Sequence, residues 1–407
     1  MRFALGLSAA VLGVLVGGCG GEPAPHGDSV PAGEAAQVAG SPLEVLRPSE
    51  LDAHFAQVLS PRQFVFPADH GPHPHYRHEW WYLTGHLEAM DGEEFGFEVT
   101  FFRVGLVPPQ ESSATPEGGE ASRWRARQIY VAHFAVTDLA RRQFHSTERR
   151  AREALGLAGA ASEPLRVWLG PWSLAADPAA PEAESDRPVW ALRVQDERYG
   201  LDLKLRALQA PVLNGDGGLS IKSDSPGAAS YYYSIPRLEV QGRLVREGKP
   251  IAVTGLAWLD REWGSGSLGR ELQGWDWYAL ELDDGSSLMF YTLRARDGGR
   301  DRHSAGTWSD ATGASGRIAS EDMRIDVLDS WVSPEGTRYP SRWRIRSPSL
   351  GLDLAVDPVL ANQELQTTPR YWEGKVSVAG TRGGRSVRGR GYVELVGYAL
   401  SAAARKR

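Results

Sequence analysis

Apolar residues alternate with polar ones along many short segments of this chain. Clear cases are residues 95–101, 190–194, 201–205 and 352–356, in which the apolar side chains occupy every second position. Alternation of this kind is the period of a β-strand that buries one face and leaves the other polar. The pattern predicts an all-β protein, with one amphipathic helical segment expected at residues 141–157.

Glycine-containing turns separate the predicted strands. Asp-Gly at 91–92 and 284–285, and Arg-Gly-Gly at 382–384, each lie between two strand-like runs, as β-hairpins require. Polar or proline-rich stretches at 108–121 and 178–187 are expected to form surface loops.

The chain contains a short internal sequence repeat, which indicates duplication. The sequence Glu-Trp-Trp-Tyr at 79–82, followed by a strand, Asp-Gly and a second strand, recurs as Trp-Asp-Trp-Tyr at 275–278 with the same sequel. Many short strands appearing twice favour two barrels or sandwiches. We therefore expect an N-terminal domain at 51–245 and a C-terminal domain at 246–401.

The N-terminus has the features of a bacterial lipoprotein signal peptide over residues 1–19. Arg2 precedes an apolar run, and the small residues Gly17 and Gly18 precede Cys19, the only cysteine of the chain. We expect lipidation of Cys19, a flexible tether over residues 20–50, and a membrane-anchored protein of the cell envelope, at the outer membrane or periplasmic face. The formal net charge of −6 argues against a nucleic-acid partner.

Five segments carry a resemblance to a known family. They are residues 66–82, 255–264, 274–278, 371–374 and 391–398, which are rich in Trp, Tyr, His and acidic residues. These segments resemble the carotenoid 1,2-hydratases (hydroxyneurosporene synthases) and the wider AttH-like group of predicted secreted hydrolases. The resemblance implies two tandem lipocalin-like antiparallel β-barrels, an apolar ligand cavity, and hydration of an isoprenoid double bond with no cofactor.

Hydration of an unactivated alkene needs a strong acid, a positioned water and surroundings that tolerate a carbocation. Asp276 lies between Trp275 and Trp277, so desolvation should raise its pKa while the indole faces stabilise a cation. Asp260 and Glu262 should share one face of a strand, where they can hold the water. These three carboxyls are our predicted catalytic residues.

A structural role is the alternative for Asp276, because Arg261 is available as its ion-pair partner. The carotenoid-hydrating members that this chain resembles use a histidine near the segment 260–263. This chain has Arg261 there and no histidine, so the resemblance does not carry that part of their chemistry over to it.

Aromatic residues beside these carboxyls are candidates for walls of a ligand cavity, although barrel core is the alternative for most of them. The predicted ligand-binding residues are Trp80, Trp81, Tyr82, Trp258, Trp263, Trp275, Trp277 and Tyr278.

Four histidines near the first motif suggest a metal site as a competing hypothesis, because imidazoles and carboxylates are common zinc ligands. Pro72 and Pro74 impose an extended path, however, so neighbouring histidines need not converge. The candidate ligands are His70, His73, His75 and His78.

Three functions remain open from the sequence. The leading one is binding of an extended apolar small molecule, isoprenoid or lipid-like, with acid-catalysed hydration. The alternatives are a non-catalytic envelope carrier of lipophilic molecules and a metal-dependent secreted hydrolase. No Gly-x-Ser-x-Gly elbow surrounds a plausible nucleophile, so a serine hydrolase is poorly supported.

Overall fold

The computed structural model describes residues 49–109, 126–180, 186–266, 268–269 and 271–399. These residues form two antiparallel β-sheets. The helical elements described are short 3₁₀-helices: η1 (Glu50–His54), η2 (Ala68–His70) and η4 (Ala154–Gly156). None of the helices in these ranges has the length and apolarity needed to span a membrane.

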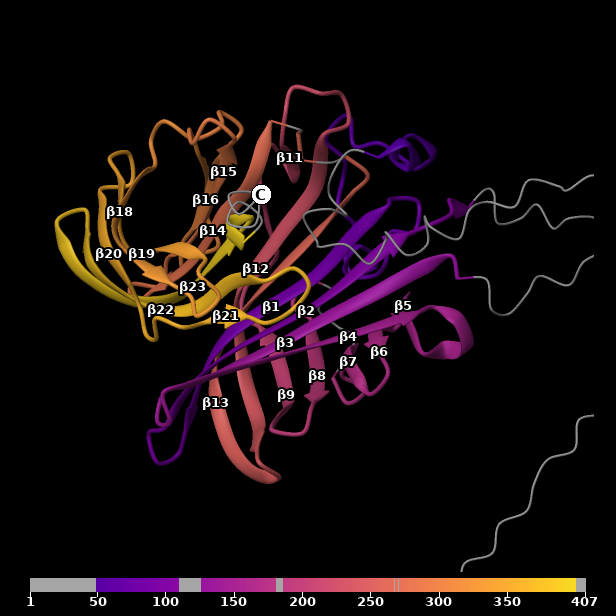
Figure 1. Cartoon of the computed structure of the whole chain (residues 1–407), viewed down its shortest axis with the longest axis horizontal. Coiled ribbons are helices and arrows are strands. Elements are labelled where there is room, and N and C mark those ends of the chain that lie inside the picture. The colour runs from indigo at the N-terminus through magenta and orange to yellow at the C-terminus, as the bar shows by residue number, and fades with distance from the viewer. Residues whose placement is uncertain (1–48, 110–125, 181–185, 267, 270, 400–407) are drawn as a thin grey trace, which may run out of the picture. The chain divides into compact units, whose positions relative to one another are not determined.

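The first sheet is a nearly closed barrel in the order β4-β3-β2-β1-β13-β12-β9-β8-β7-β6-β5, with β10 and β11 added beside β12 (Figure 1). Its two ends meet because β3 contacts β5 and β6, and β4 contacts β6. Its strands are β1 (His78–Ala89), β2 (Glu94–Gly105), β3 (Gln128–Asp138), β4 (Gln143–Arg152), β5 (Ala158–Ser162), β6 (Leu165–Leu169), β7 (Trp172–Ala176), β8 (Val189–Gln195), β9 (Tyr199–Ala207), β10 (Val212–Leu213), β11 (Leu219–Ile221), β12 (Ala229–Arg246) and β13 (Lys249–Gly264).

The second sheet is a half-barrel in the order β17-β16-β15-β14-β23-β22-β20-β19-β18, with β21 beside β22. Its strands are β14 (Leu272–Leu282), β15 (Ser287–Ala295), β16 (Ala305–Ser309), β17 (Ser315–Ile318), β18 (Arg324–Val332), β19 (Arg338–Ser347), β20 (Leu352–Pro358), β21 (Glu364–Leu365), β22 (Tyr371–Arg382) and β23 (Arg385–Val396).

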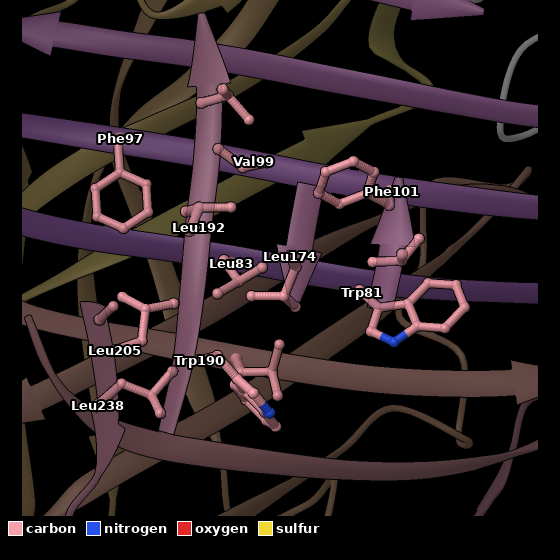
Figure 2. Close-up of a cluster of buried hydrophobic side chains, with 14 of the residues drawn as sticks. Trp81, Leu83, Phe97, Val99, Phe101, Leu174, Trp190, Leu192, Leu205 and Leu238 are labelled. Atoms are coloured by element: carbon pink, nitrogen blue, oxygen red, sulfur yellow. The ribbon is translucent and has the colours of Figure 1, made fainter. Parts of the chain in front are cut away.

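Each sheet encloses an apolar core formed by the inward residues of its strands. In the first barrel, Trp81, Leu83, Phe97, Val99 and Trp190 are among the side chains that pack together (Figure 2). The second sheet has its own cluster, with Tyr278, Leu280 and Trp343. The alternation seen in the sequence is therefore the alternation between these interiors and the outer faces.

A third cluster lies between the two sheets and decides where chemistry can occur. It joins the outer faces of β1, β12 and β13 to those of β14, β15 and β23, through residues such as Tyr82, Trp258, Trp277 and Tyr291. The outer face of the first barrel is thus covered here by the second sheet, so its polar side chains are buried.

The fold class is confirmed: the protein is all-β, with two lipocalin-like sheets. The hairpins at 91–92, 284–285 and 382–384 connect β1 to β2, β14 to β15 and β22 to β23. The helix expected at 141–157 is wrong, because β4 occupies residues 143–152 and pairs with β3. Charged residues on both faces of β4 produced the misleading pattern.

The change of sheet occurs later than the division predicted near residue 245. That position lies at the β12–β13 hairpin, where Val245 pairs with Pro250 inside the first sheet. The chain enters the second sheet only after Gly264, with β14 beginning at Leu272. The signal peptide, Cys19, the tether up to residue 48, and most of the loop at 108–121 lie outside the described residues.

Candidate active site between the two sheets

Strand β13 divides its side chains between two environments. Arg261 and Trp263 point into the first barrel, whereas Asp260 and Glu262 point toward the second sheet. The register places Tyr82 of β1 beside Asp260. The prediction that the two acidic residues share one face of a strand agrees with this arrangement.

Asp260 is a buried carboxyl surrounded by neutral donors. Its oxygens accept hydrogen bonds from Tyr232 Oη, from Ser234 Oγ at 2.5 Å and from Trp258 Nε1 at 2.6 Å. Burial raises the pKa of Asp260 to about 7, although these hydrogen bonds act in the opposite direction. Asp260 can therefore both donate and accept a proton near neutral pH.

Glu262, two residues along the same face, has a cation beside it. Lys222 Nζ lies 3.0 Å from Glu262 Oε1, and Ser230 Oγ donates a hydrogen bond to that oxygen. The ammonium also lies 4.3 Å from the centre of the Tyr291 ring. Burial lowers the pKa of Lys222, but the charges of Glu262, Tyr291 and Asp260 and the hydrogen bond to Glu262 together outweigh burial, so the pKa is raised and the lysine stays charged.

Three further glutamates enter the same layer from neighbouring strands. Glu373 of β22 pairs in register with Glu394 of β23, while Glu98 lies on β2. Tyr82 Oη donates to Glu373 Oε1 at 2.5 Å, and Trp275 Nε1 donates to Glu394 Oε2 at 2.8 Å. We call Asp260, Glu262, Glu98, Glu373 and Glu394 the inter-sheet carboxyls.

The inter-sheet carboxyls from the second sheet and β2 have raised pKa values. Burial raises the pKa of Glu98 to about 8 and that of Glu394 to about 7, and it raises that of Glu373 well above its ordinary value. The charges of Asp260 and Glu262 add to the effect on Glu394. Within the described residues, neither Glu98, Glu373, Glu394 nor Asp260 forms an ion pair with Lys or Arg. The layer therefore retains protons at neutral pH.

Asp276 lies elsewhere. Because it alternates with Trp275 and Trp277 on β14, its side chain points into the second sheet's interior, where Arg294 Nε lies 2.9 Å away and Tyr398 Oη 3.0 Å away. Burial raises its pKa, whereas Arg294 lowers it. The structure thus separates Asp276 from Asp260 and Glu262. Its ion-pair partner is Arg294 and not Arg261.

The predicted ligand-binding aromatic residues fall into three groups according to the face of their strand. Trp81 and Trp263 belong to the core of the first barrel, and Tyr278 to that of the second sheet. The others pack between the sheets around the carboxyls: Trp80, Tyr82, Trp258, Trp275 and Trp277.

The histidines of the first motif have separate partners. His73 Nδ1 lies 2.7 Å from Glu79 Oε1, His70 Nδ1 lies 2.6 Å from Tyr233 Oη, and His78 Nε2 lies 3.7 Å from Asp52. His75 is exposed. In the described ranges, no group of three or more His, Cys, Asp or Glu side chains is arranged to hold a metal ion.

Sequence reasoning missed several members of the layer: Glu98, Glu373, Glu394, Tyr232 and Lys222. Glu98 occupies an outward position of an alternating strand, which normally faces water. Glu373 and Glu394 lie inside the C-terminal motifs at 371–374 and 391–398 and were available as signals. The register that brings the two together could not be read from spacing.

A nearly closed β-barrel joined to a half-barrel, with buried carboxyls between them, defines a class of two-sheet lipocalin-like proteins. The AttH-like family model matches residues 57–398, and the chain belongs to this family.

Solved structures agree with this assignment. The chain is 32% identical to a protein assigned as AttH from Nitrosomonas europaea, covering 84% of this chain and all of that one, with a TM-score of 0.72. Kievitone hydratase from Nectria haematococca has the same fold at 14% identity and a TM-score of 0.62, over 84% of this chain and 96% of that one.

One curated relative is a dehydratase, asqC of Emericella nidulans. It is 27% identical over 225 residues, which are 50% of this chain and 61% of that protein. The match therefore spans less than two thirds of the relative.

Proposed function

We propose that this protein is a hydro-lyase, which adds water to a small organic molecule or removes water from it at the inter-sheet carboxyls. The observation that carries the proposal is Asp260, a buried carboxyl with a pKa of about 7 whose charge helps to raise the pKa of a second, partly exposed carboxyl, Glu394. Similarity to the dehydratase of Emericella nidulans supports the same reaction class.

The chemistry needs two groups with opposite protonation states. In dehydration, a base removes a proton from carbon while an acid protonates the departing hydroxyl, and hydration reverses both transfers. Asp260 and Glu394, each with a pKa of about 7, can hold one proton between them at neutral pH. Glu394, which is the more exposed of the two, is assigned to contact the substrate, and Asp260 to exchange the proton.

The aromatic surroundings indicate the class of substrate. Trp80 and Trp275 are partly exposed beside the carboxyls, and Trp277 Nε1 donates to Tyr232 Oη at 3.1 Å. Indole and phenol faces bind apolar carbon skeletons and stabilise positive charge developing on carbon. We propose an isoprenoid or other lipid-like substrate, reached at the cell envelope by a protein anchored through a lipid on Cys19.

The test combines recovery of the natural ligand with an activity measurement. Small molecules extracted from the protein, purified from its own membranes, are identified by mass spectrometry. The wild type is then incubated with lycopene in isotopically labelled water. Incorporation of one labelled water per molecule supports hydration. An unmodified lipid bound equally by the wild type and by the Asp260→Asn variant makes the protein a carrier and refutes the proposal.

Two carboxyl variants decide which acid acts. Asp260→Asn should lower turnover by about 10²–10⁴-fold, as expected for loss of a general acid or base. If Asp276→Asn abolishes turnover and Asp260→Asn retains it, the reaction belongs to the interior of the second sheet. Asp353→Asn, an exposed carboxyl paired with Arg344 on the outer surface, is the matched control.

A further inference from the structure

The layer between the sheets contains a small hollow next to the carboxyls. It lies on the same faces of β1 and β14, at residues that follow Tyr82 and Trp277. It has room for about one water molecule. On β1, Thr84 and His86 follow Tyr82, and on β14, Ala279 and Glu281 follow Trp277. We call this space the inner hollow; the lining residues used below are Thr84, His86, Trp258, Ala279, Glu281 and Tyr392.

Three side chains that line the inner hollow have buried polar atoms without hydrogen bonds from the described residues. They are Nδ1 of His86, both carboxyl oxygens of Glu281 and Oη of Tyr392, and these residues are only 4%, 5% and 3% exposed. A buried donor or acceptor left without a partner destabilises a protein, so such groups normally bind a ligand or an ordered water. The atoms therefore indicate a binding site.

The charges around the inner hollow select a neutral ligand. Arg390 Nε lies 3.7 Å from Glu281 Oε2, and Arg237 lies close enough to lower the pKa of Glu281, while burial raises that pKa to about 7. Burial, Lys375 and Arg390 hold the pKa of His86 well below its ordinary value. With these cations already present, a metal ion is disfavoured. A water molecule fits the size and can satisfy the carboxyl and the imidazole together.

The inner hollow lies between solvent and the inter-sheet carboxyls. On one side, Glu281 adjoins Arg390, whose side chain is 41% exposed. On the other side, the ring of Trp258 lines the hollow, while its Nε1 donates to Asp260 at 2.6 Å. Thr84 occupies the position on β1 next to Tyr82 on the same face.

We propose that the inner hollow is a water-binding site that supplies water to the inter-sheet carboxyls from the Arg390 edge. Water is the second substrate of a hydration and a product of a dehydration. A path separate from the aromatic side lets water move while the organic substrate occupies that side. The supply role rests on the proposed hydro-lyase function, whereas the binding of water does not.

The first test is a high-resolution crystal structure of the wild-type protein. We expect an ordered water within hydrogen-bonding distance of both Glu281 and His86 Nδ1. A dry hollow in that structure would overturn the inference, whether or not the protein is an enzyme.

The second test fills the inner hollow. Ala279→Leu should displace the water and lower turnover by about tenfold with an unchanged KM for the organic substrate, since substrate binding is retained. Glu281→Leu removes a hydrogen-bonding partner of the water and should also lower turnover. Glu281→Gln retains the shape and the hydrogen bonding of the side chain and should keep most of the wild-type turnover. Met289→Leu, a volume-conserving change in the same inter-sheet cluster, is the control.

The outcomes separate this inference from the proposed function. A wild type that shows bound water but no hydro-lyase activity refutes the function and leaves the water site standing. An active wild type whose Ala279→Leu variant loses the water but keeps full turnover refutes the supply role.

Discussion

Glu79 and Glu98 are equally buried glutamates that lie on opposite faces of the first barrel. Their surroundings differ because, among the residues that the structure describes, only Glu79 has arginine partners. Glu79 is inside the barrel, where Arg103 Nε and Arg261 Nη2 lie 2.8 and 2.7 Å from its oxygens. Glu98 is between the sheets, where its described hydrogen-bond partner is the hydroxyl of Thr100.

The cations reverse the effect of burial. Burial raises the pKa of Glu79, but Arg103, Arg261 and His73 together outweigh burial and hold that pKa well below its ordinary value. For Glu98 no cation opposes burial, and the pKa rises to about 8. Burial alone therefore does not identify a proton-exchanging carboxyl. The partners decide whether it is a permanent ion or an acid near neutral pH.

The largest effect of a single substitution should follow from removing a cation inside the barrel. Arg261→Met leaves Glu79 with one guanidinium and also removes donors to the Trp80 and Gly71 carbonyl oxygens. Breaking a buried ion pair on one side should lower the free energy of unfolding by about 3–5 kcal/mol. Urea denaturation at pH 7 measures this, and a loss below about 1 kcal/mol would show that the network is dispensable.

The two faces should also differ in how stability depends on pH. Asp260, Glu394 and Glu98 have folded pKa values of about 7, 7 and 8, so between pH 5 and 8 the folded state binds more protons than the unfolded state. Stability should fall across this window by about 1.4 kcal/mol per pH unit for each titrating carboxyl. Glu79 has a lowered pKa, so it stabilises the folded state at every pH above the pKa that it has in the unfolded chain. That contribution is lost only in more acidic solution.

Urea denaturation at several values between pH 5 and 8 tests this dependence, and Glu98→Gln should flatten it. A free energy of unfolding that stays constant or increases from pH 5 to 8 contradicts the raised pKa values of the inter-sheet carboxyls.

Lys222 tests the contribution of a cation on the inter-sheet face. Lys222→Met removes the ammonium 3.0 Å from Glu262 and should lower the free energy of unfolding by about 1–3 kcal/mol, because a buried carboxylate then lacks its ion-pair partner. Replacing both partners, in a Lys222→Met, Glu262→Gln double variant, should recover most of that loss, and Lys222→Arg should behave like the wild type. A double variant as unstable as Lys222→Met in urea denaturation would mean that packing, not charge, is responsible.

The smallest effect is expected at the surface. Arg344 makes two contacts with Asp353, at 2.7 and 2.8 Å, but both side chains are largely exposed. Arg344→Ala should change the free energy of unfolding by about 0–1 kcal/mol. A larger change, measured by the same denaturation, would show that exposed pairs contribute as much as the buried ones compared above.

Local pattern was enough to predict the fold class. Alternation defines strands such as β2 and β9, and glycine turns define hairpins, because both depend on neighbours in sequence. The sheet to which β13 belongs depends on its pairing with β1, more than 150 residues away in the chain, and this pairing leaves no local mark. For this reason the sequence did not indicate that residue 245 lies at the β12–β13 hairpin, inside the first sheet.

The candidate site was predictable only in part. The shared face of Asp260 and Glu262 follows from the two-residue period of a strand. The same period places Asp276 opposite Trp275 and Trp277, but the contacts of each face depend on the partner sheet. Glu98 looked like a solvent-facing residue, because nothing in its own strand indicates that a second sheet covers it.

Alternate residues of strand β13 point into the barrel interior and into the layer between the sheets. A shift in its register would therefore disturb both environments at once. Deleting one residue between Gly255 and Trp258 would shift the remaining side chains to the opposite faces. Asp260 and Glu262 would then enter the barrel interior, where Arg103 is already paired with Glu79, while Arg261 and Trp263 would be moved among the inter-sheet carboxyls. Length changes in this strand should therefore be tolerated far less than substitutions, and natural insertions are expected in the hairpins at its ends.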